Sequence, residues 1–596
     1  MGLLGVHRGR RACRSVLACG LLCSLRLLSA EGAVQAVLDG GFFGHPQGGV
    51  SVNGQELLPS TITDLVVLAN GKIVVCGSTN TRNALPQAKQ FHLLLDEAVG
   101  TNMAFVAQFS ADLKTAEWLS LFPFDCIVPR KIMRCPDGTF VLGARRMERL
   151  LEWVPEDQQG RWKDNQAVLI KLSPEGREIR WVHPGAPNQI DVTGLAVDAQ
   201  GVIYWSGGTL GPEQPALVCR VDPDGQRLLP WAGRPDADIQ WALNLHGTSP
   251  DLNQTGQFWH FYRRAQTQPY DYDGRRGSAA ETVIDPEGLR QGGPLLLLPD
   301  GDLIIGATFQ YRYHETGGRR HGGRDLFLAR YDRDGRLKWS TNLYRRGDGI
   351  HGLEQRLVDL AYDPASGALF VLAHQHGTAR YKLLGDLVGN PGNSVLSWVG
   401  RVDARSGGLT HGWYFQNPRP DSPDGWPQLS SNALTDLELD DAGQVYLTGG
   451  GGAATVTTKG ALQSWPREQK GAEHGVLVVL DNTLQRMRFA SLIRGTAEAD
   501  LQRWPACEFH ALGLNQHGVI LGGTTQTDRL PLRHTAGWSA FEGERSRGAF
   551  LGLLRFETSR QRTLPVTALP ESSGDVTADN AAPPLATSAP PGFRPY

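Results

Sequence analysis

The segment LPDGDLIIGATFQ, residues 298–310, places two apolar runs on either side of a short polar turn. Similar segments occur as CPDGTFVLGARR at 135–146, VDAQGVIYWSGGT at 197–209 and LDDAGQVYLTGGG at 439–451. Asp-Gly and related dipeptides adopt the positive φ angles that tight hairpin turns require, and the flanking runs are rich in strand-forming residues. We therefore predict one β-hairpin at each of these positions.

The same hairpin occurs seven times along the chain. Its turn glycines lie between 63 and 76 residues apart, except for one interval of 100 residues; they are Gly71, Gly138, Gly201, Gly301, Gly367, Gly443 and Gly518. A second hairpin follows each of the first six copies, and its second strand carries a large aromatic residue. We predict that these rings share one register and pack between neighbouring sheets. They are Trp118, Trp181, Trp231, Trp339, Trp413 and Phe489.

Two hairpins make one antiparallel sheet of four strands. Such a sheet cannot bury both faces alone, and stacking seven sheets in a ring buries them all. The sequence therefore predicts an all-β fold, a seven-bladed β-propeller of four-stranded antiparallel blades. The seventh copy has a third strand at 549–556 and no fourth, whereas AVQAVLDGG at 33–41 precedes the first copy. We expect the N-terminal strand to complete the last blade and close the ring.

The run DVTGLAVDAQGVIYWSGGT, followed by ALVCRVDPDGQRLLPW, resembles the seven-bladed β-propeller repeat family known as SBBP, as does LTDLELDDAGQVYLTGG. The resemblance covers most of residues 33–556, with degenerate second, fifth and seventh copies. The family is common in exported bacterial proteins, so the resemblance implies export and a propeller fold. It implies no reaction, because one fold serves many functions.

The chain ends differ in composition from the 31–557 region. Four arginines precede an apolar run within residues 1–30, which predicts a signal peptide and a secreted, periplasmic or cell-surface protein. No later segment is apolar enough to be predicted as a transmembrane helix. Residues 558–596 are rich in Pro, Ala, Ser and Thr, which predicts a disordered tail. A formal charge of −2 over 596 residues gives no sign of nucleic-acid binding, and we expect a monomer.

Five cysteines follow the predicted signal peptide. Cys76 and Cys219 are expected to be free thiols buried in strands. Cys126 and Cys135 are near enough in the sequence to be joined by a disulfide across a turn. No paired-cysteine zinc spacing, nucleophile elbow or phosphate-binding loop is present, so no cofactor is expected.

Propeller geometry assigns the short turns to one face and the long loops to the other. The long segments are 80–102, 146–165, 310–324, 376–395, 453–473 and 526–547, together with an inter-blade insert at 233–290. Loops on a rigid scaffold commonly carry function, so the long-loop face is predicted to be the working surface.

The insert and its neighbours supply the candidate ligand-binding residues. Aromatic rings can stack on sugar faces, and arginine pairs can bind anionic groups. The candidates are Trp259, Tyr262, Arg263, Arg264, Tyr270, Arg319, Arg320, Arg345 and Arg346. The alternatives are that these aromatic residues form a small satellite core and that the arginines are solvated. His314, His351, His374 and His376 are weak metal candidates, against the alternative of ordinary polar loop residues.

Three functions are compatible with these features. The first is an exported propeller that binds a ligand or partner, such as an anionic polysaccharide or a protein, through its long-loop face. The second is a polysaccharide lyase or hydrolase that uses His and Arg side chains on that face. The third is a cell-surface scaffold. The absence of catalytic motifs favours binding or display over catalysis.

Overall fold

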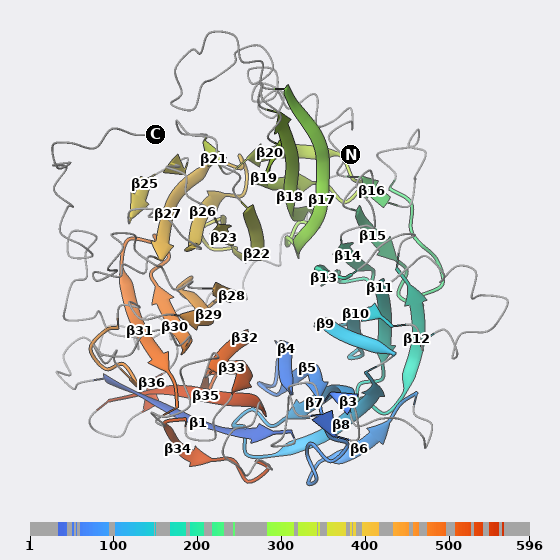
Figure 1. Cartoon of the computed structure of the whole chain (residues 1–596), viewed down its shortest axis with the longest axis vertical. Coiled ribbons are helices and arrows are strands. Elements are labelled where there is room, and N and C mark those ends of the chain that lie inside the picture. Colours follow the sequence, from blue (N-terminus) through green and yellow to red (C-terminus); the bar gives the residue numbers. More distant parts are fainter. Residues whose placement is uncertain are drawn as a thin grey trace, which may run out of the picture.

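The computed structural model describes residues 34–44, 51–52, 55–56, 60–94, 102–124, 126–147, 150, 167–185, 191–207, 217–231, 242–244, 283–314, 320–342, 344–345, 354–376, 382–383, 386–388, 396–415, 433–451, 457–463, 474–495, 507–525, 530–539, 548–558 and 563–564. Seven sheets of these residues stand around a central axis (Figure 1). The predicted seven-bladed, all-β propeller is confirmed.

Blades 1 to 4 follow one another along the chain. Blade 1 contains β4 (Thr61–Val67), β5 (Ile73–Thr79), β7 (Met103–Phe109), β8 (Ala116–Pro123) and β6 (Lys89–His92). Blade 2 contains β9 (Ile127–Arg134), β10 (Phe140–Arg146), β11 (Ala167–Leu172) and β12 (Ile179–Pro184). Blade 3 contains β13 (Gly194–Val197), β14 (Ile203–Gly207), β15 (Leu217–Val221) and β16 (Ala242–Asn244). Blade 4 contains β17 (Val283–Leu297), β18 (Leu303–His314), β19 (Arg320–Tyr331) and β20 (Leu337–Asn342).

Blades 5 to 7 complete the ring. Blade 5 contains β22 (Glu354–Asp363), β23 (Ala368–His376), β26 (Leu396–Asp403), β27 (Leu409–Phe415) and β25 (Asp386–Val388). Blade 6 contains β28 (Ala433–Leu439), β29 (Val445–Gly451), β30 (His474–Leu480) and β31 (Met487–Ile493). Blade 7 contains β32 (Cys507–Asn515), β33 (Gly518–Thr525), β35 (Gly548–Thr558), β1 (Val34–Phe43), β34 (Leu532–Thr535) and β36 (Thr563–Leu564).

Two further strand pairs lie outside the blades: β2 (Ser51–Val52) with β3 (Gln55–Glu56), and β21 (Tyr344–Arg345) with β24 (Lys382–Leu383). Within the blades, the innermost strands are β4, β9, β13, β17, β22, β28 and β32. Each contacts the innermost strand of the next blade, and β32 contacts β4, which completes the circle (Figure 1).

All seven glycines predicted to sit in hairpin turns have positive φ angles. The angle lies between 69° and 85° in six of them and is 149° at Gly518. In six of the seven turns the glycine N–H donates to a backbone carbonyl at the end of the first strand, which closes the turn. Gly301, for example, donates to Leu298 O at 2.9 Å. The turn dipeptides thus fix the register of each inner hairpin, as the sequence predicts.

The N-terminal strand closes the ring. β1 pairs antiparallel with β35 over ten residues, from Val34 opposite Thr558 to Phe43 opposite Ala549. On its other edge, β34 pairs with β1 in parallel. The Asp39 carboxylate on β1 forms an ion pair with Arg555 and lies 3.0 Å from His534 Nδ1. The predicted closure of the last blade by the N-terminal strand is therefore confirmed.

The large aromatic residues of the predicted fourth strands pack between blades, as predicted. Each of four tryptophans lies against a positive-φ glycine in the outer turn of the next blade, where any side chain would collide with the ring. The pairs are Trp118 with Gly176, Trp181 with Gly225, Trp231 with Gly335, and Trp339 with Gly407. A glycine at this turn position lets the indole ring fill the gap between two sheets.

Two details of the predicted outer hairpins are wrong. Trp413 pairs with Val399, whereas Trp118, Trp181 and Trp339 pair with residues nearer the outer turn, so Trp413 is shifted along its strand. In blade 3, Leu228 makes a single bridge to Val221, and Ala242–Asn244 forms the fourth strand instead. Proline at 230 has no N–H to donate, which disfavours continuation of the strand through Trp231.

The disulfide that the sequence allows between Cys126 and Cys135 does not form. Both residues are buried without a disulfide, as are Cys76, Cys219 and Cys507. Strand β9 separates the two residues, and an extended strand of this length spans roughly 25 Å, far more than a disulfide can bridge. Cys126 and Cys135 accordingly belong to different hydrophobic clusters.

Three long loops return to their own blades. β6, β25 and β34 lie within the segments predicted as loops at 80–102, 376–395 and 526–547, and each adds a parallel outer strand. β36 pairs with β35 inside the segment predicted as a disordered tail. The rest of that tail, the signal segment and most of the 233–290 insert lie outside the described residues.

Candidate functional site in the central channel

The inner strands share a β-bulge at the same level of the ring. A register shift occurs there in β4, β9, β17, β22, β28 and β32. A threonine hydroxyl donates across the inner hairpin at this level, from Thr63 to Cys76 O at 3.2 Å, and from Thr435 to Thr448 O at 3.3 Å. A bulge bends the strand and changes the direction of the next side chain and amide.

An aspartate follows the bulge in blades 1, 5 and 6. Each carboxylate accepts a hydrogen bond from a backbone N–H on the inner strand of the next blade. The bonds run from Ile132 to Asp64 at 2.7 Å, from Leu437 to Asp359 at 2.9 Å, and from Leu512 to Asp436 at 2.6 Å. These aspartates therefore stabilise the junctions between blades and also bring negative charge to the centre of the ring.

The inner strands enclose a central cavity of about 370 Å³, the channel site. Four carboxylates and one ammonium group line it: Asp64, Asp359, Asp436, Glu438 and Lys131. The positions of blades 3, 4 and 7 that correspond to Asp64 carry the uncharged Gly194, Pro294 and Ala511. The charged side chains thus come from blades 1, 2, 5 and 6, and the adjacent blades 3 and 4 form an apolar arc.

Lys131 occupies in blade 2 the bulge position that aspartate occupies in blade 1. Its Nζ lies 3.4 Å from Asp64 Oδ1, and both side chains are largely shielded from solvent. The Asp64 carboxylate holds the pKa of Lys131 above its usual range, so the amine stays charged. Burial raises the pKa of Asp64, although Lys131 opposes the rise. A buried ion pair of this kind keeps a fixed cation inside an acidic channel.

Asp359 and Asp436 form a carboxylate pair. The Leu437 N–H donates to both, at 2.9 Å to Asp359 Oδ2 and 3.1 Å to Asp436 Oδ1. Burial and the neighbouring Asp359 carboxylate hold the pKa of Asp436 well above its usual range. The raised pKa favours the protonated form of Asp436, so this side chain can donate a hydrogen bond as well as accept one.

Glu438 is the channel carboxyl that is open to the cavity. Its side chain is exposed to the channel, which the inner strands of the blades surround laterally. This burial, together with Asp359 and Asp64, raises the pKa of Glu438 to about 8. The group is therefore largely a neutral acid at pH 7, which makes it a hydrogen-bond donor to anything that enters the cavity.

The variant Glu438→Gln tests this assignment through the pH dependence of stability. The folded-state pKa lies above that of the unfolded chain, near 4.3, so the stabilisation is complete at low pH. It is lost as the pH rises through about 8. Glutamine mimics the neutral acid at every pH. We expect equal melting temperatures for variant and native protein at pH 4, and a variant that melts about 2 °C higher at pH 9. A difference in melting temperature that does not change with pH would contradict the raised pKa.

The structure describes few of the residues predicted to bind ligand or metal. Trp259, Tyr262, Arg263, Arg264, Tyr270, Arg319, Arg346 and His351 lie outside the described residues. The backbones of Arg320, Arg345, His314 and His376 lie in β19, β21, β18 and β23, and His314 pairs with Arg320. His374 Nε2 lies 2.5 Å from Leu434 O on the next blade, and burial lowers the pKa of its ring. This contact gives His374 a role in joining blades 5 and 6.

Within the described ranges, no group of three or more His, Cys, Asp or Glu side chains is arranged to hold a metal ion. In the same ranges, no helix has the length and apolar character needed to cross a membrane. The polar side chains that the structure does bring together are those of the channel site, which the sequence analysis did not single out. The repeated Thr-Asp-Leu at 63–65 and 435–437 was the available signal.

No protein-family profile and no curated protein matches the sequence. Solved structures with a similar course of the chain have low identity. One is an ulvan lyase bound to a glucuronate–rhamnose-3-sulfate unit, at 9% identity and TM-score 0.38, with 82% of this chain and 94% of that one covered. Another is the β-propeller domain of the trilobed protease from Pyrococcus furiosus, at 7% identity and TM-score 0.33, with 87% and 99% covered. A third is the α-L-arabinanase of Penicillium chrysogenum with arabinobiose, at 10% identity and TM-score 0.33, with 87% and 98% covered.

Proposed function

We propose that the protein is an exported ligand-binding propeller whose channel site takes a small hydroxyl-rich ligand, a neutral or amino sugar or the end of a glycan chain. The observation that carries this proposal is the lining of the cavity: four carboxyl groups and one ammonium group opposite an apolar arc. A cavity of about 370 Å³ is within the usual size of small-ligand sites.

The polar groups of the channel suit hydroxyl groups. Asp359 can accept hydrogen bonds from a ligand, and the neutral Glu438 carboxyl and the Lys131 ammonium can donate them. The apolar arc, with Leu195 and Leu295, suits the C–H face of a sugar ring. The carboxylate surplus disfavours an acidic sugar in the channel itself. Anionic polysaccharide binding by the long-loop arginines stays a separate prediction, as does export through residues 1–30.

Saturation-transfer NMR with methyl glucoside and glucosamine, each at about 10 mM, tests the proposal. We expect both sugars to show transfer, with glucosamine stronger because its ammonium group meets the channel carboxylates. A glucosamine derivative with a permanent trimethylammonium charge should bind Glu438→Gln more weakly than native protein at pH 9, where native Glu438 is ionised and glucosamine itself has lost its ammonium proton. Methyl glucoside should bind both proteins nearly equally. Equal signals from Glu438→Gln and native protein for the trimethylammonium derivative at pH 9, or no signal from either sugar, would reject the channel as a sugar site.

One observation also favours a catalytic reading of the same site. A neutral acid at Glu438 stands among ionisable carboxylates, and glycoside hydrolysis uses one acid and one carboxylate whose pKa values differ. In that case the native protein releases reducing ends from a neutral polysaccharide, and Glu438→Gln abolishes the release. Sugar binding without release of reducing ends would show that the protein binds sugars and does not hydrolyse them.

A further inference from the structure

A cation near the end of the third strand joins successive blades. It occupies the same position in blades 2, 3 and 4, next to the outer turn. In each case it donates to a backbone carbonyl in the outer turn of the next blade. The bonds are Lys171 to Pro223 O at 3.0 Å, Arg220 to Arg333 O at 3.0 Å, and Arg330 to Ala404 O at 2.8 Å.

In blades 2 and 4 the inner turn of the same blade supplies a carboxylate for this cation. Lys171 Nζ lies 3.0 Å from Asp137. Arg330 lies 2.5 Å from Asp300 and 2.6 Å from Asp302. The cation is thus neutralised within its own blade in both cases, as the burial of a charge requires.

Blade 3 lacks these carboxylates. Aligned on the turn glycine, Gln200 stands where Asp137 and Asp300 stand, and Val202 stands where Asp302 stands. Arg220 therefore has no ion pair in the part of the chain that the structure describes. Its Nη2 donates to Pro230 O of its own blade, and its Nε is buried and has no hydrogen-bond partner. An arginine of this kind retains unused capacity for an oxyanion.

The tryptophan of blade 3 also differs from those of its neighbours. The indole N–H donates to the next outer turn in blade 2, from Trp181 to Pro223 O at 3.1 Å, and in blade 4, from Trp339 to Ala404 O at 2.9 Å. Trp231 is 2% exposed, and its N–H has no partner among the described residues. Its ring lies 4.4 Å from the Arg220 guanidinium, which holds the arginine in place.

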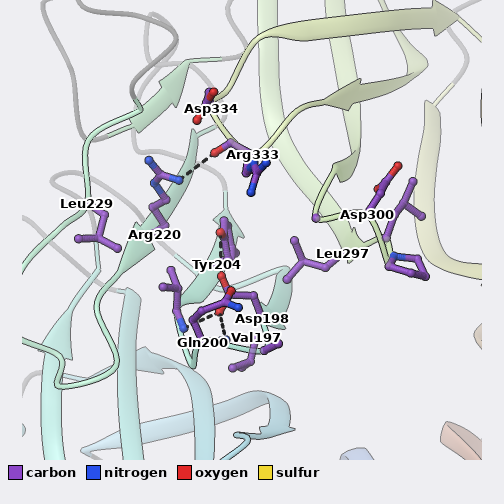
Figure 2. Close-up of a pocket in the computed structure, with 15 residues that line it drawn as sticks. Val197, Asp198, Gln200, Tyr204, Arg220, Leu229, Leu297, Asp300, Arg333 and Asp334 are labelled. Carbon is purple, nitrogen blue, oxygen red and sulfur yellow. Dashed lines mark hydrogen bonds between the residues drawn. The ribbon is translucent and has the colours of Figure 1, made fainter. Parts of the chain in front are cut away.

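A pocket of about 650 Å³ opens at this point, between blades 3 and 4 on the short-turn face. Figure 2 shows Arg220 and Leu229 on one side and Asp300 and Leu297 on the other. We call it the inter-blade pocket. It lies opposite to the long-loop face, so it is distinct from the predicted working surface.

The carboxylates of the inter-blade pocket already have partners. Asp198 accepts from the Tyr204 hydroxyl at 3.1 Å and from two backbone N–H groups of its own turn. Asp300 is paired with Arg330, and Asp334 with Arg336. Arg333 is exposed at the pocket rim and, like Arg220, forms no ion pair with a described residue. The free charge of the pocket is therefore positive.

We propose that the inter-blade pocket binds a small ligand that carries a carboxylate. Its carboxylate pairs with the Arg220 guanidinium through the N–H groups that Arg333 O and Pro230 O leave free. Arg220 has Gln200 and Val202 where Arg330 has Asp300 and Asp302. Leu229, Leu297 and the Tyr204 ring contact the apolar part of the ligand. Arg333 adds a second positive charge at the entrance.

Isothermal titration calorimetry at constant ionic strength tests this site with sodium glucuronate, acetate and sulfate as probes. We expect glucuronate to bind, and Arg220→Gln to weaken it at least tenfold. Acetate has the carboxylate but no sugar ring, so the difference between its affinity and that of glucuronate measures the contribution of the ring. Tighter binding of sulfate than of either carboxylate would overturn the choice of a planar anion.

Two further variants separate binding from folding. Gln200→Asp restores the carboxylate that blades 2 and 4 possess, so it should raise the melting temperature and weaken glucuronate binding at least tenfold. Arg401→Gln changes the corresponding arginine of blade 5, far from the pocket, and should leave glucuronate binding unchanged. Native affinity in both Arg220→Gln and Gln200→Asp, with cooperative unfolding retained, would overturn the proposal, as would no response of the native protein to any probe.

Discussion

Deletion of residues 31–44 is expected to abolish the cooperative thermal unfolding transition of this protein. The deletion removes β1, which pairs with β35 along ten residues and buries four side chains almost completely: Ala36, Leu38, Phe42 and Phe43. Loss of one buried phenylalanine typically costs about 3–5 kcal/mol, and whole domains have about 5–15 kcal/mol of stability. The loss of β1 therefore approaches or exceeds the stability of the whole fold.

The measurement is a thermal scan by circular dichroism of purified protein, with limited proteolysis of blade 7 as a second readout. A synthetic peptide of residues 31–46 added to the truncated chain should restore the transition, and a scrambled peptide should not. Removal of residues 570–596 is the matched control and should leave the melting temperature unchanged. A truncated protein that unfolds at the native temperature without the peptide would show that β1 contributes nothing to closure.

Trp538→Ala is expected to destabilise the protein by about 3–5 kcal/mol. Trp538 is 1% exposed and belongs to the cluster that joins blades 7 and 1. Its ring centroid lies 4.9 Å from that of Phe109 and 6.3 Å from that of Phe43, and its N–H donates to Leu113 O at 2.6 Å. It fills at the closing junction the place that the fourth-strand tryptophans fill elsewhere, and urea unfolding gives the change.

Trp538→Phe separates the ring from its hydrogen bond. It keeps most of the aromatic packing and leaves the Leu113 carbonyl without this donor, so about 1–2 kcal/mol of destabilisation is expected. A loss from Trp538→Ala no larger than that from Trp538→Phe would mean that the ring does not pack between blades 7 and 1.

The fold was predictable because its signals are local and repeated. A turn glycine fixes each hairpin register, after Asn or Asp at Gly71, Gly138 and Gly301, and the strand residues on either side follow from it. Closure was predictable because the seventh copy ends at its third strand and an apolar strand at 33–41 precedes the first copy. Both inferences depend on comparison between copies, which one sequence supplies by itself.

The errors lie where tertiary contacts override the local pattern. LLPW at 228–231 matches the other outer strands, yet the strand is formed by Ala242–Asn244 after an insertion. Trp538 lies in a segment predicted as loop, and only ring closure places it beside Phe109 and Leu113. Sequence distance alone left a disulfide between Cys126 and Cys135 open, and the strand that separates them excludes it.

The channel site was not predicted, for a related reason. An aspartate in Thr-Asp-Leu reads as an ordinary polar strand residue in each copy. Only the ring brings Asp64, Asp359 and Asp436 to one level, where Lys131 replaces the aspartate of blade 2. The inter-blade pocket was missed for the same reason. Gln200 is an ordinary turn residue by sequence, and only the ion pair of Arg330 with Asp300 in the next blade shows that blade 3 lacks a carboxylate at this position.

Cysteine cross-linking of β1 to β35 tests the closed ring most directly. Gln35 lies opposite Glu557, and Gln35 is exposed. We expect the pair Gln35→Cys and Glu557→Cys to form a disulfide on mild oxidation, seen as one linked peptide by mass spectrometry. The off-register pair Gln35→Cys and Leu553→Cys should form none. Equal cross-linking of both pairs, or none in the first, would contradict a ring closed by the N-terminal strand.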